Sequence, residues 1–309
     1  MSASKRGDEN GVVLYAALAA NLGIAVAKFA AATITGSGAM LTEGFHSVVD
    51  SLNQILLLYG RRRARRPADE AHPAGYGREL YFWSFVVAIL IFATGAGLSV
   101  LEGVAHLRHP EAPSDPAVAY AVLGVSALLE GTSWATAIRA FARAKGDQGW
   151  WQAIRRSKDP PSFIVLFEDS AALTGLAIAA LGVWLSHHTG DGRWDGIASI
   201  LIGVVLGVVA ILLARESKGL LIGERAAPAL IEAIRSAFEN RPEVTRVGEI
   251  VTVHLGPESV FVAASVDFED SVPVGAIETL IADAEAALRR DWPAISSLYI
   301  KPKASRPAG

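Results

Sequence analysis

Six long apolar stretches occupy the first two-thirds of the 309-residue chain, and they leave few folds open to it. A helix needs roughly 20 apolar residues to cross a bilayer, and each stretch comes close to that length. The stretches cover residues 12–33, 37–60, 80–105, 116–138, 162–186 and 194–214. Hydrophobic residues make up 51% of the sequence and charged residues only 19%, which is unusual for a soluble protein of this size. The pattern predicts an α-helical membrane protein with six transmembrane helices.

Basic residues gather in the loops that follow the second and fourth stretches. These loops hold Arg61, Arg62, Arg63, Arg65, Arg66 and Arg78, and Arg139, Arg143, Lys145, Arg155, Arg156 and Lys158. The loops on the opposite side carry only Arg108 and Arg193. Because lysine and arginine concentrate in cytoplasmic loops, we expect both termini in the cytoplasm. The expected location is a plasma membrane, in particular a bacterial inner membrane.

The residues after the last stretch have the composition of an ordinary soluble domain. Periodicity predicts helices over 226–240 and 274–290 and strands over 247–254, 260–268 and 297–300. This αββαβ order is typical of a small α+β sandwich of the ferredoxin-like kind. We therefore expect a cytoplasmic tail over 1–10, a transport domain over 11–215 and a cytoplasmic α+β domain over 216–309, with residues 215–223 as the link.

The second apolar stretch carries three ionisable side chains, Glu43, His46 and Asp50. Ionisable groups inside a bilayer-length helix are costly and therefore usually functional. At 100° per residue the three fall within about 60° of arc, with Asn53 on nearly the same face. One imidazole and two carboxylates on one stripe suit a borderline divalent cation such as zinc. The chain has no cysteine, so any metal site must use histidine, carboxylate or amide groups.

Local patterns add to this architecture and give the chain a resemblance to a known family. They are His46-x-x-x-Asp50, the loop His72-Pro-Ala-Gly-Tyr-Gly-Arg-Glu79, and Asp195-Gly-Ile-Ala-Ser at the start of the sixth stretch. With them the chain resembles the cation diffusion facilitator family. Asp159-Pro-Pro, Val165-Leu-Phe-Glu-Asp-Ser-Ala-Ala172 and Glu216-Ser-Lys-Gly-Leu-Leu-Ile-Gly-Glu224 resemble the branch that contains zinc transporter nine. The resemblance implies a homodimeric, proton-coupled antiporter that exports a divalent metal cation, with zinc the expected metal, from the cytoplasm.

The resemblance also implies which side chains hold the ion. In this family the second and fifth spans each give two ligands four residues apart, and here they supply His46, Asp50 and Asp169. Val165 stands at the position of the remaining ligand. Glu168, Glu43, Asn53 and water are the alternatives for completing the site. The cation is a substrate and the proton its counter-ion, so no resident cofactor is expected; metal and protons compete for the same ligands.

Other polar residues have less specific interpretations. Glu102 lies near the outer end of its span, where a solvated flank is one interpretation. Glu130 lies deeper in its span, where helix–helix hydrogen bonding is the simpler interpretation and a proton or ion path the alternative. Some relatives bind a second zinc in the loop that here holds Asp69 and His72, but Tyr76 replaces one of the ligands. We expect this loop to pack on the α+β domain.

The α+β domain contains one histidine, His254, and the family's C-terminal ligand positions are Tyr299 and Lys301. A lysine is a poor ligand and repels a cation. We therefore expect no binuclear zinc site, and a domain that dimerises by packing.

The sequence is also compatible with two other functions. A membrane-embedded metal-dependent enzyme would use the cluster to hold a catalytic ion, but no nucleophile-and-base pair accompanies it. A non-transporting family member would act as a partner or scaffold, which the valine at position 165 favours. Cobalt, iron, nickel and manganese are alternative metals. The net charge of −3 gives no support for nucleic-acid binding, so the expected partners are the metal ion, the lipid bilayer and a second copy of the chain.

Overall fold

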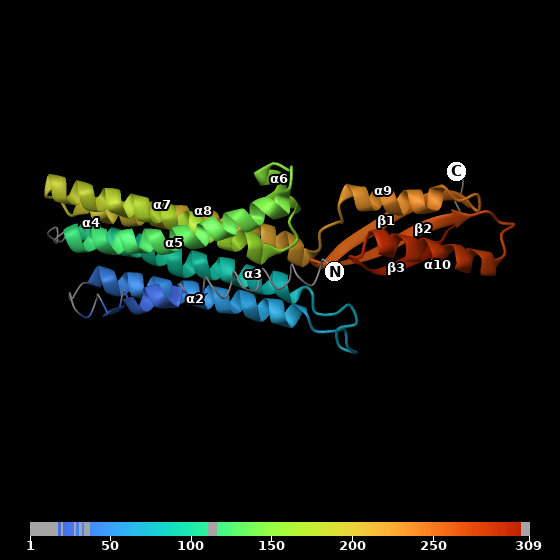
Figure 1. Ribbon diagram of the computed structural model, residues 1–309, viewed down its shortest axis with the longest axis horizontal. Helices are drawn as coiled ribbons and strands as arrows, with labels where there is room; N and C mark the ends of the chain where they lie inside the picture. Colours follow the sequence, from blue (N-terminus) through green and yellow to red (C-terminus); the bar gives the residue numbers. More distant parts are fainter. Residues whose placement is uncertain are drawn as a thin grey trace. The chain divides into compact units, whose positions relative to one another are not determined.

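The computed structural model describes residues 18–19, 21–27, 29–30, 33, 38–110 and 116–303. The side chains of 38–46, 118, 155 and 156 lie outside that description. The chain forms two compact units, one from residues 1–62 and 82–218 and the other from 63–81 and 219–309. The first unit is helical, and its long helices run along a common direction (Figure 1). The second unit combines helices with a sheet.

The helical unit contains long helices in the places where the sequence predicts them. They are α2 (Gly38–Ala64), α3 (Glu79–Leu90), η1 (Ile91–Ala96), α4 (Gly97–Arg108), α5 (Pro116–Lys145), the short α6 (Trp150–Arg156), α7 (Pro160–Thr189) and α8 (Arg193–Ile222). Among the described residues, four helices are long and apolar enough to cross a membrane: Glu79–Arg108, Ala119–Lys145, Pro160–Thr189 and Arg193–Ile222. The second predicted span is part of α2. Of the first, 12–33, the structure describes residues 18–19, 21–27, 29–30 and 33, which are helical, so a total of six remains a prediction.

The four candidate spans expose large apolar side chains on their outer surface. Leu101, Leu128 and Ile211 are 67%, 71% and 60% exposed. Apolar surface on this scale is unfavourable in water, whereas hydrocarbon is its natural surrounding. The exposed side chains therefore agree with the sequence in indicating a bilayer around this unit.

The third predicted span is one helical segment with a wider turn in its middle. The π-helical η1 separates α3 from α4, and such turns are frequent at functional sites. On the far side of the turn, α4 meets α8 through glycines. A Cβ atom on Gly103 would lie 2.6 Å from the carbonyl oxygen of Gly196, so neither helix can carry a larger residue at this crossing.

The link expected over 215–223 is a continuation of the last helix of the first unit. Helix α8 continues to Ile222, because the charged residues after position 214 are compatible with a helix. The helix ends at Gly223, whose φ of +119° lies in a region that other residues rarely adopt. Polarity therefore marked the end of the apolar stretch but not the end of the helix.

The second unit has the predicted αββαβ order. Its elements are α9 (Pro228–Glu239), β1 (Val244–Gly256), β2 (Ser259–Phe268), α10 (Val274–Asp291) and β3 (Ile295–Pro302). Strand β2 is central, antiparallel to β1 and parallel to β3 (Figure 1). Alternate residues of β2 are buried, and they pack with Leu230, Ile234 and Phe238 of α9 and Leu280 of α10. The α+β class is confirmed; the described sheet has three strands, so the ferredoxin-like assignment stays a prediction.

Residues 63–81 fold with the second unit and not with the helices that they connect. Gly77 lies against the carbonyl oxygen of Leu255, where β1 turns into β2, and a Cβ atom at position 77 would clash with that oxygen. Arg63 and Glu79, at the two ends of the loop, form an ion pair of 2.8 Å. The sequence-based expectation that this loop packs on the α+β domain agrees with these contacts.

Candidate metal-binding site

A small cavity in the helical unit brings together polar side chains that lie far apart in the sequence. Asp50 and Asn53 of α2 line it with Glu168 of α7, and Thr94 of the π-helical turn closes one side. The rest of the lining is apolar and comes from α2, the π-helical turn, α7 and α8. The cavity has a volume of about 20 Å³. This is room for about one water-sized occupant, and therefore for one bare metal ion.

Asn53 ties α2 to α7 inside this cavity. Its side chain is fully buried, and its Nδ2 donates a hydrogen bond of 3.2 Å to Oε1 of Glu168. Because a carboxylate only accepts, the amide nitrogen must face Glu168, which leaves Oδ1 on the other side. Oδ1 is buried and accepts no hydrogen bond from any described residue. Such an oxygen is an available ligand for a cation.

Asp169 faces a different neighbour from Glu168. Its side chain is 9% exposed, and its Oδ2 accepts a hydrogen bond of 2.8 Å from Oγ of Ser133 on α5. The next residue, Ser170, accepts a hydrogen bond of 2.9 Å from Nε1 of Trp134. Helix α7 therefore directs Glu168 toward α2 and Asp169 toward α5, as the 100° between successive residues requires.

The remaining predicted ligands lie in a helix, but their side chains are outside the described part of the structure. Glu43 and His46 belong to α2, and His46 lies one turn before Asp50 on the same face. Among the described residues, no group of three or more histidine and carboxylate side chains is close enough to hold a metal ion. The structure thus brings Asp50 and Glu168 to one cavity and leaves the full ligand set a prediction.

Comparison with known proteins identifies the family. The family model of the cation efflux transmembrane domain matches residues 14–222. The chain belongs to the cation efflux family. It is the cation diffusion facilitator family that the sequence motifs resemble, a family of membrane-spanning transporters and not of enzymes.

The curated relatives place the chain near zinc transporter nine. It is 34% identical over 248 residues to the human protein named proton-coupled zinc antiporter SLC30A9, mitochondrial, covering 79% of this chain and 44% of the relative. It is 34% identical over 249 residues to metal tolerance protein C4 of Arabidopsis thaliana, covering 80% and 54%. The chain therefore spans about half the length of these relatives.

More distant matches include one bacterial protein and one solved structure. Manganese efflux system protein MneP of Bacillus subtilis is 23% identical over 254 residues, covering 80% of each chain. A nickel form of the MamM C-terminal domain is 19% identical, with a TM-score of 0.24, and covers 26% of this chain and all of that one.

Three features of the candidate site were not found by reasoning from the sequence. They are the π-helical turn beside the cavity, the Ser133 contact to Asp169, and the Asn53 contact to Glu168. A threonine followed by a glycine within an apolar run was the only trace of the π turn. Ser133 lies one turn from Glu130 on α5, so a polar stripe on that helix was the available signal.

The loop between α2 and α3 uses Asp69 for internal hydrogen bonds. Oδ2 accepts one of 2.6 Å from the Tyr76 hydroxyl, and Oδ1 accepts one of 2.7 Å from the backbone N–H of His72. The hydrogen bond from Tyr76 holds the pKa of Asp69 below its usual value, and the same bond raises the pKa of Tyr76. Both carboxylate oxygens thus hold the loop together, with the rings of His72 and Tyr76 4.3 Å apart.

Proposed function

We propose that the chain is a proton-coupled antiporter that carries a divalent metal cation, preferentially zinc, out of the cytoplasm. The observation that carries the proposal is the ion-sized cavity between α2, the π-helical turn and α7, where Asp50, Asn53 and Glu168 meet. Two carboxylates and an amide beside an ion-sized space within a unit of bilayer-spanning helices are costly to keep there, and such groups are usually functional. Membership of the cation efflux family supports the same reading.

The proposed ligands are His46 and Asp50 on α2 and Asp169 on α7; Asp169 hydrogen-bonds Ser133 and does not line the cavity, so its carboxylate would turn toward the cavity to contact the ion. Glu168 and Glu43 are the protein candidates for the remaining position, beside the amide oxygen of Asn53 and water. A site with one exchangeable position suits an ion that must be released again. Because an imidazole is among the ligands, zinc or cobalt is favoured over manganese.

Proton coupling follows from the chemistry of these ligands. Zinc binds deprotonated carboxylates and neutral imidazole, so each ion that binds displaces protons. Protons that refill the emptied site on the far side of the membrane then drive the return step. The name of the human relative includes the words proton-coupled, which supports the assignment.

Reconstituted vesicles with an imposed pH gradient test the proposal. We expect zinc flux that depends on the gradient, and loss of that flux in His46→Ala and Asp50→Ala with normal membrane insertion. Val48→Ala is the matched control, because Val48 lies on α2 two residues from Asp50 and is 44% exposed. Normal exchange in either ligand variant would contradict the shared site.

Metal preference gives a second test of His46. Replacing the imidazole with a carboxylate in His46→Asp makes the ligand set all-oxygen, which suits manganese better than zinc. We expect competition assays to show a shift toward manganese. Unchanged selectivity would mean that His46 does not contact the ion.

A second candidate function is a non-transporting partner in a larger assembly. Val165, 4% exposed, fills the family's fourth ligand position with an apolar side chain, and this observation favours that alternative. The same vesicles decide it, since a scaffold would show no metal flux under any gradient. Other divalent cations, namely cobalt, iron, nickel and manganese, belong in the same panel.

We further propose that the protein is a homodimer in a plasma membrane with both termini in the cytoplasm. Val251 and Tyr299 are 43% and 63% exposed on the sheet of the second unit, which gives a partner an apolar surface to cover. We expect the full chain to remain dimeric in detergent after chelator treatment. Dissociation by chelator would reveal a metal bridge between the protomers.

A further inference from the structure

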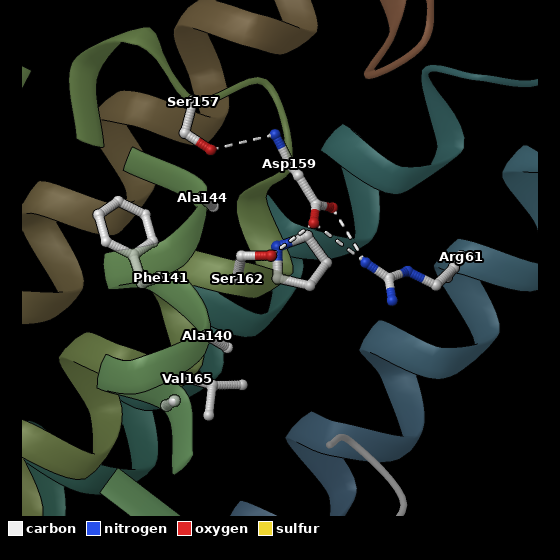
Figure 2. Close-up of a pocket in the computed structure, with 10 residues that line it drawn as sticks. Arg61, Ala140, Phe141, Ala144, Ser157, Asp159, Ser162 and Val165 are labelled. Carbon is white, nitrogen blue, oxygen red and sulfur yellow. Dashed lines mark hydrogen bonds and ion pairs between the residues drawn. The ribbon is translucent and has the colours of Figure 1, made fainter. Parts of the chain in front are cut away.

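A second cavity lies at the end of α2 that joins the arginine-rich loop. It has a volume of about 160 Å³ and lies between α2, the last turns of α5 and the start of α7 (Figure 2). Arg61 and Asp159 stand at one side of it, and Ala137, Ala144 and Val165 are among its apolar lining residues. By the distribution of basic residues, this is the cytoplasmic end of the helical unit.

Arg61 and Asp159 join the two helices that carry the proposed ligands. Nη2 of Arg61 lies 3.1 Å from each carboxylate oxygen of Asp159, and Ser162 also donates a hydrogen bond to that carboxylate (Figure 2). Arg61 lies in the last turn of α2, and Asp159 directly precedes α7. Helix dipoles favour a cation at the first position and an anion at the second, so the backbone of both helices reinforces the pair.

The cavity lies in line with the proposed site. Its floor contains Val165, which is one turn, or about 6 Å, before Asp169 on the same face of α7. On α5 the floor contains Ala137, one turn after the Ser133 that hydrogen-bonds Asp169. The facing sides of α5 and α7 thus lead from the cavity to the buried carboxylate of Asp169.

We propose that this cavity is the vestibule through which a divalent cation reaches the site from the cytoplasm, and that the Arg61–Asp159 ion pair closes it. This inference rests on the proposed function. With the pair formed, the two ligand helices are held together at this end, and the guanidinium lies across the path of a like-charged ion. The side chains are 14% and 24% exposed. Ion pairs that water still reaches are weak enough to break in every cycle.

Cysteine labelling tests the closure without measuring transport. The chain has no native cysteine, so an introduced thiol is the only one present. Ala137→Cys reports on the floor, which is 5% exposed, and Ala144→Cys reports on the exposed rim two turns away on α5. A charged, water-soluble thiol reagent is added from the cytoplasmic side of vesicles containing the full-length protein.

We expect Arg61→Gln to speed labelling of Ala137→Cys by about fivefold, the scale of one modest ion pair, and to leave Ala144→Cys unchanged. Asp159→Asn should have the same effect, and the double variant should be no faster than either single one, because both remove the same pair. Arg62→Gln is the matched control, since it removes an exposed neighbouring charge that does not line the cavity.

Two results would overturn the inference. One is an unchanged labelling rate at Ala137→Cys in both Arg61→Gln and Asp159→Asn. The other is an Arg62→Gln effect as large as that of Arg61→Gln, which would indicate a general charge effect. If labelling responds as expected while no variant or parent chain moves metal, the closure stands and the proposed transport function fails.

Discussion

Both units of the chain have an apolar core, but they differ in the apolar side chains that they expose and in the polar side chains that they bury. The helical unit turns leucines and isoleucines outward and keeps Asn53, Ser84 and Asp169 inside. The α+β unit keeps Ile234, Phe238 and its β2 valines inside, as a water-soluble domain does. One chain therefore combines an outer surface suited to lipid with an outer surface suited to water, and the proposed chemistry lies at the buried polar groups of the helical unit.

The comparison distinguishes two effects of burying a side chain, one for apolar groups and one for polar groups. In the α+β unit a buried side chain contributes mainly by removing apolar surface from water. In the helical unit lipid offers no such gain, so a buried polar group is retained for its hydrogen bonds or its ligand atoms. The same substitution should therefore fail for different reasons in the two units.

The largest effect is expected at the buried carboxylates of α7. Asp169→Asn should abolish metal flux while the protein still inserts and folds, because the change removes a charge and keeps the shape. Glu168→Gln should keep partial flux, because Glu168 would orient Asn53 or relay protons. Flux in vesicles checks both. The reverse ranking would show that Glu168 is the direct ligand and Asp169 is not.

Phe238→Ala should destabilise the α+β unit by about 3–5 kcal/mol, since the ring is fully buried and its removal leaves a cavity. Leu128→Ala, at a 71% exposed position of α5, should change stability by less than about 0.5 kcal/mol. Hydrogen exchange of the β2 amides in the intact protein measures the first effect. An equal loss of unfolding free energy in Phe238→Ala and Leu128→Ala would contradict the proposed difference between the two units.

Ser133→Ala should lower metal flux by about tenfold, because it removes the hydrogen bond that orients Asp169. Ser133→Thr keeps the hydroxyl and should restore most of the activity. Vesicle flux at saturating and at low zinc separates weaker binding from slower turnover. A Ser133→Ala variant with parental flux would mean that α5 does not position the carboxylate.

The smallest effect is expected in the exposed loop of the second unit. Tyr76→Phe should raise the pKa of Asp69 toward its usual value near 3.9, because the lost hydrogen bond stabilised the charged form. Since the pKa of Asp69 is lowered in the folded state, its contribution to loop order is present above the unfolded pKa. That contribution disappears as pH falls through the lowered value. Carboxyl NMR titration measures the shift, and an unchanged pKa would contradict the role of Tyr76.

The sequence predicted the elements that depend on periodicity. The αββαβ order of the second unit and the long helices of the first follow from the spacing of apolar residues. It missed features that depend on backbone register or on pairs of distant residues. The π-helical turn has no repeating pattern, and the Arg61–Asp159 pair joins residues 98 positions apart. The continuation of α8 to Ile222 was missed because hydropathy reports the solvent around a helix and not its hydrogen bonds.

For the candidate site, the sequence identified residues but not their directions. Adjacent Glu168 and Asp169 were both candidates, and the structure sends one to Asn53 and the other to Ser133. Angular spacing on α7 fixes the difference between the two directions, but only the packing of α2 and α5 fixes which neighbour each carboxylate meets. The contacts of these carboxylates join α2, α5 and α7, and the spacing of residues within one helix does not predict contacts between helices.

The π-helical turn makes the third span asymmetric about its midpoint. Between Ile91 and Ala96 the wider turn takes up one residue more than an α-helical turn would. If this segment were wound as an ordinary α-helix, the register of α4 would shift by about 100°, and Gly103 would no longer face the backbone of Gly196. The contact between α4 and α8 therefore depends on the backbone hydrogen bonding of this turn, and a deletion of one residue within it should be tolerated better than a deletion elsewhere in the span.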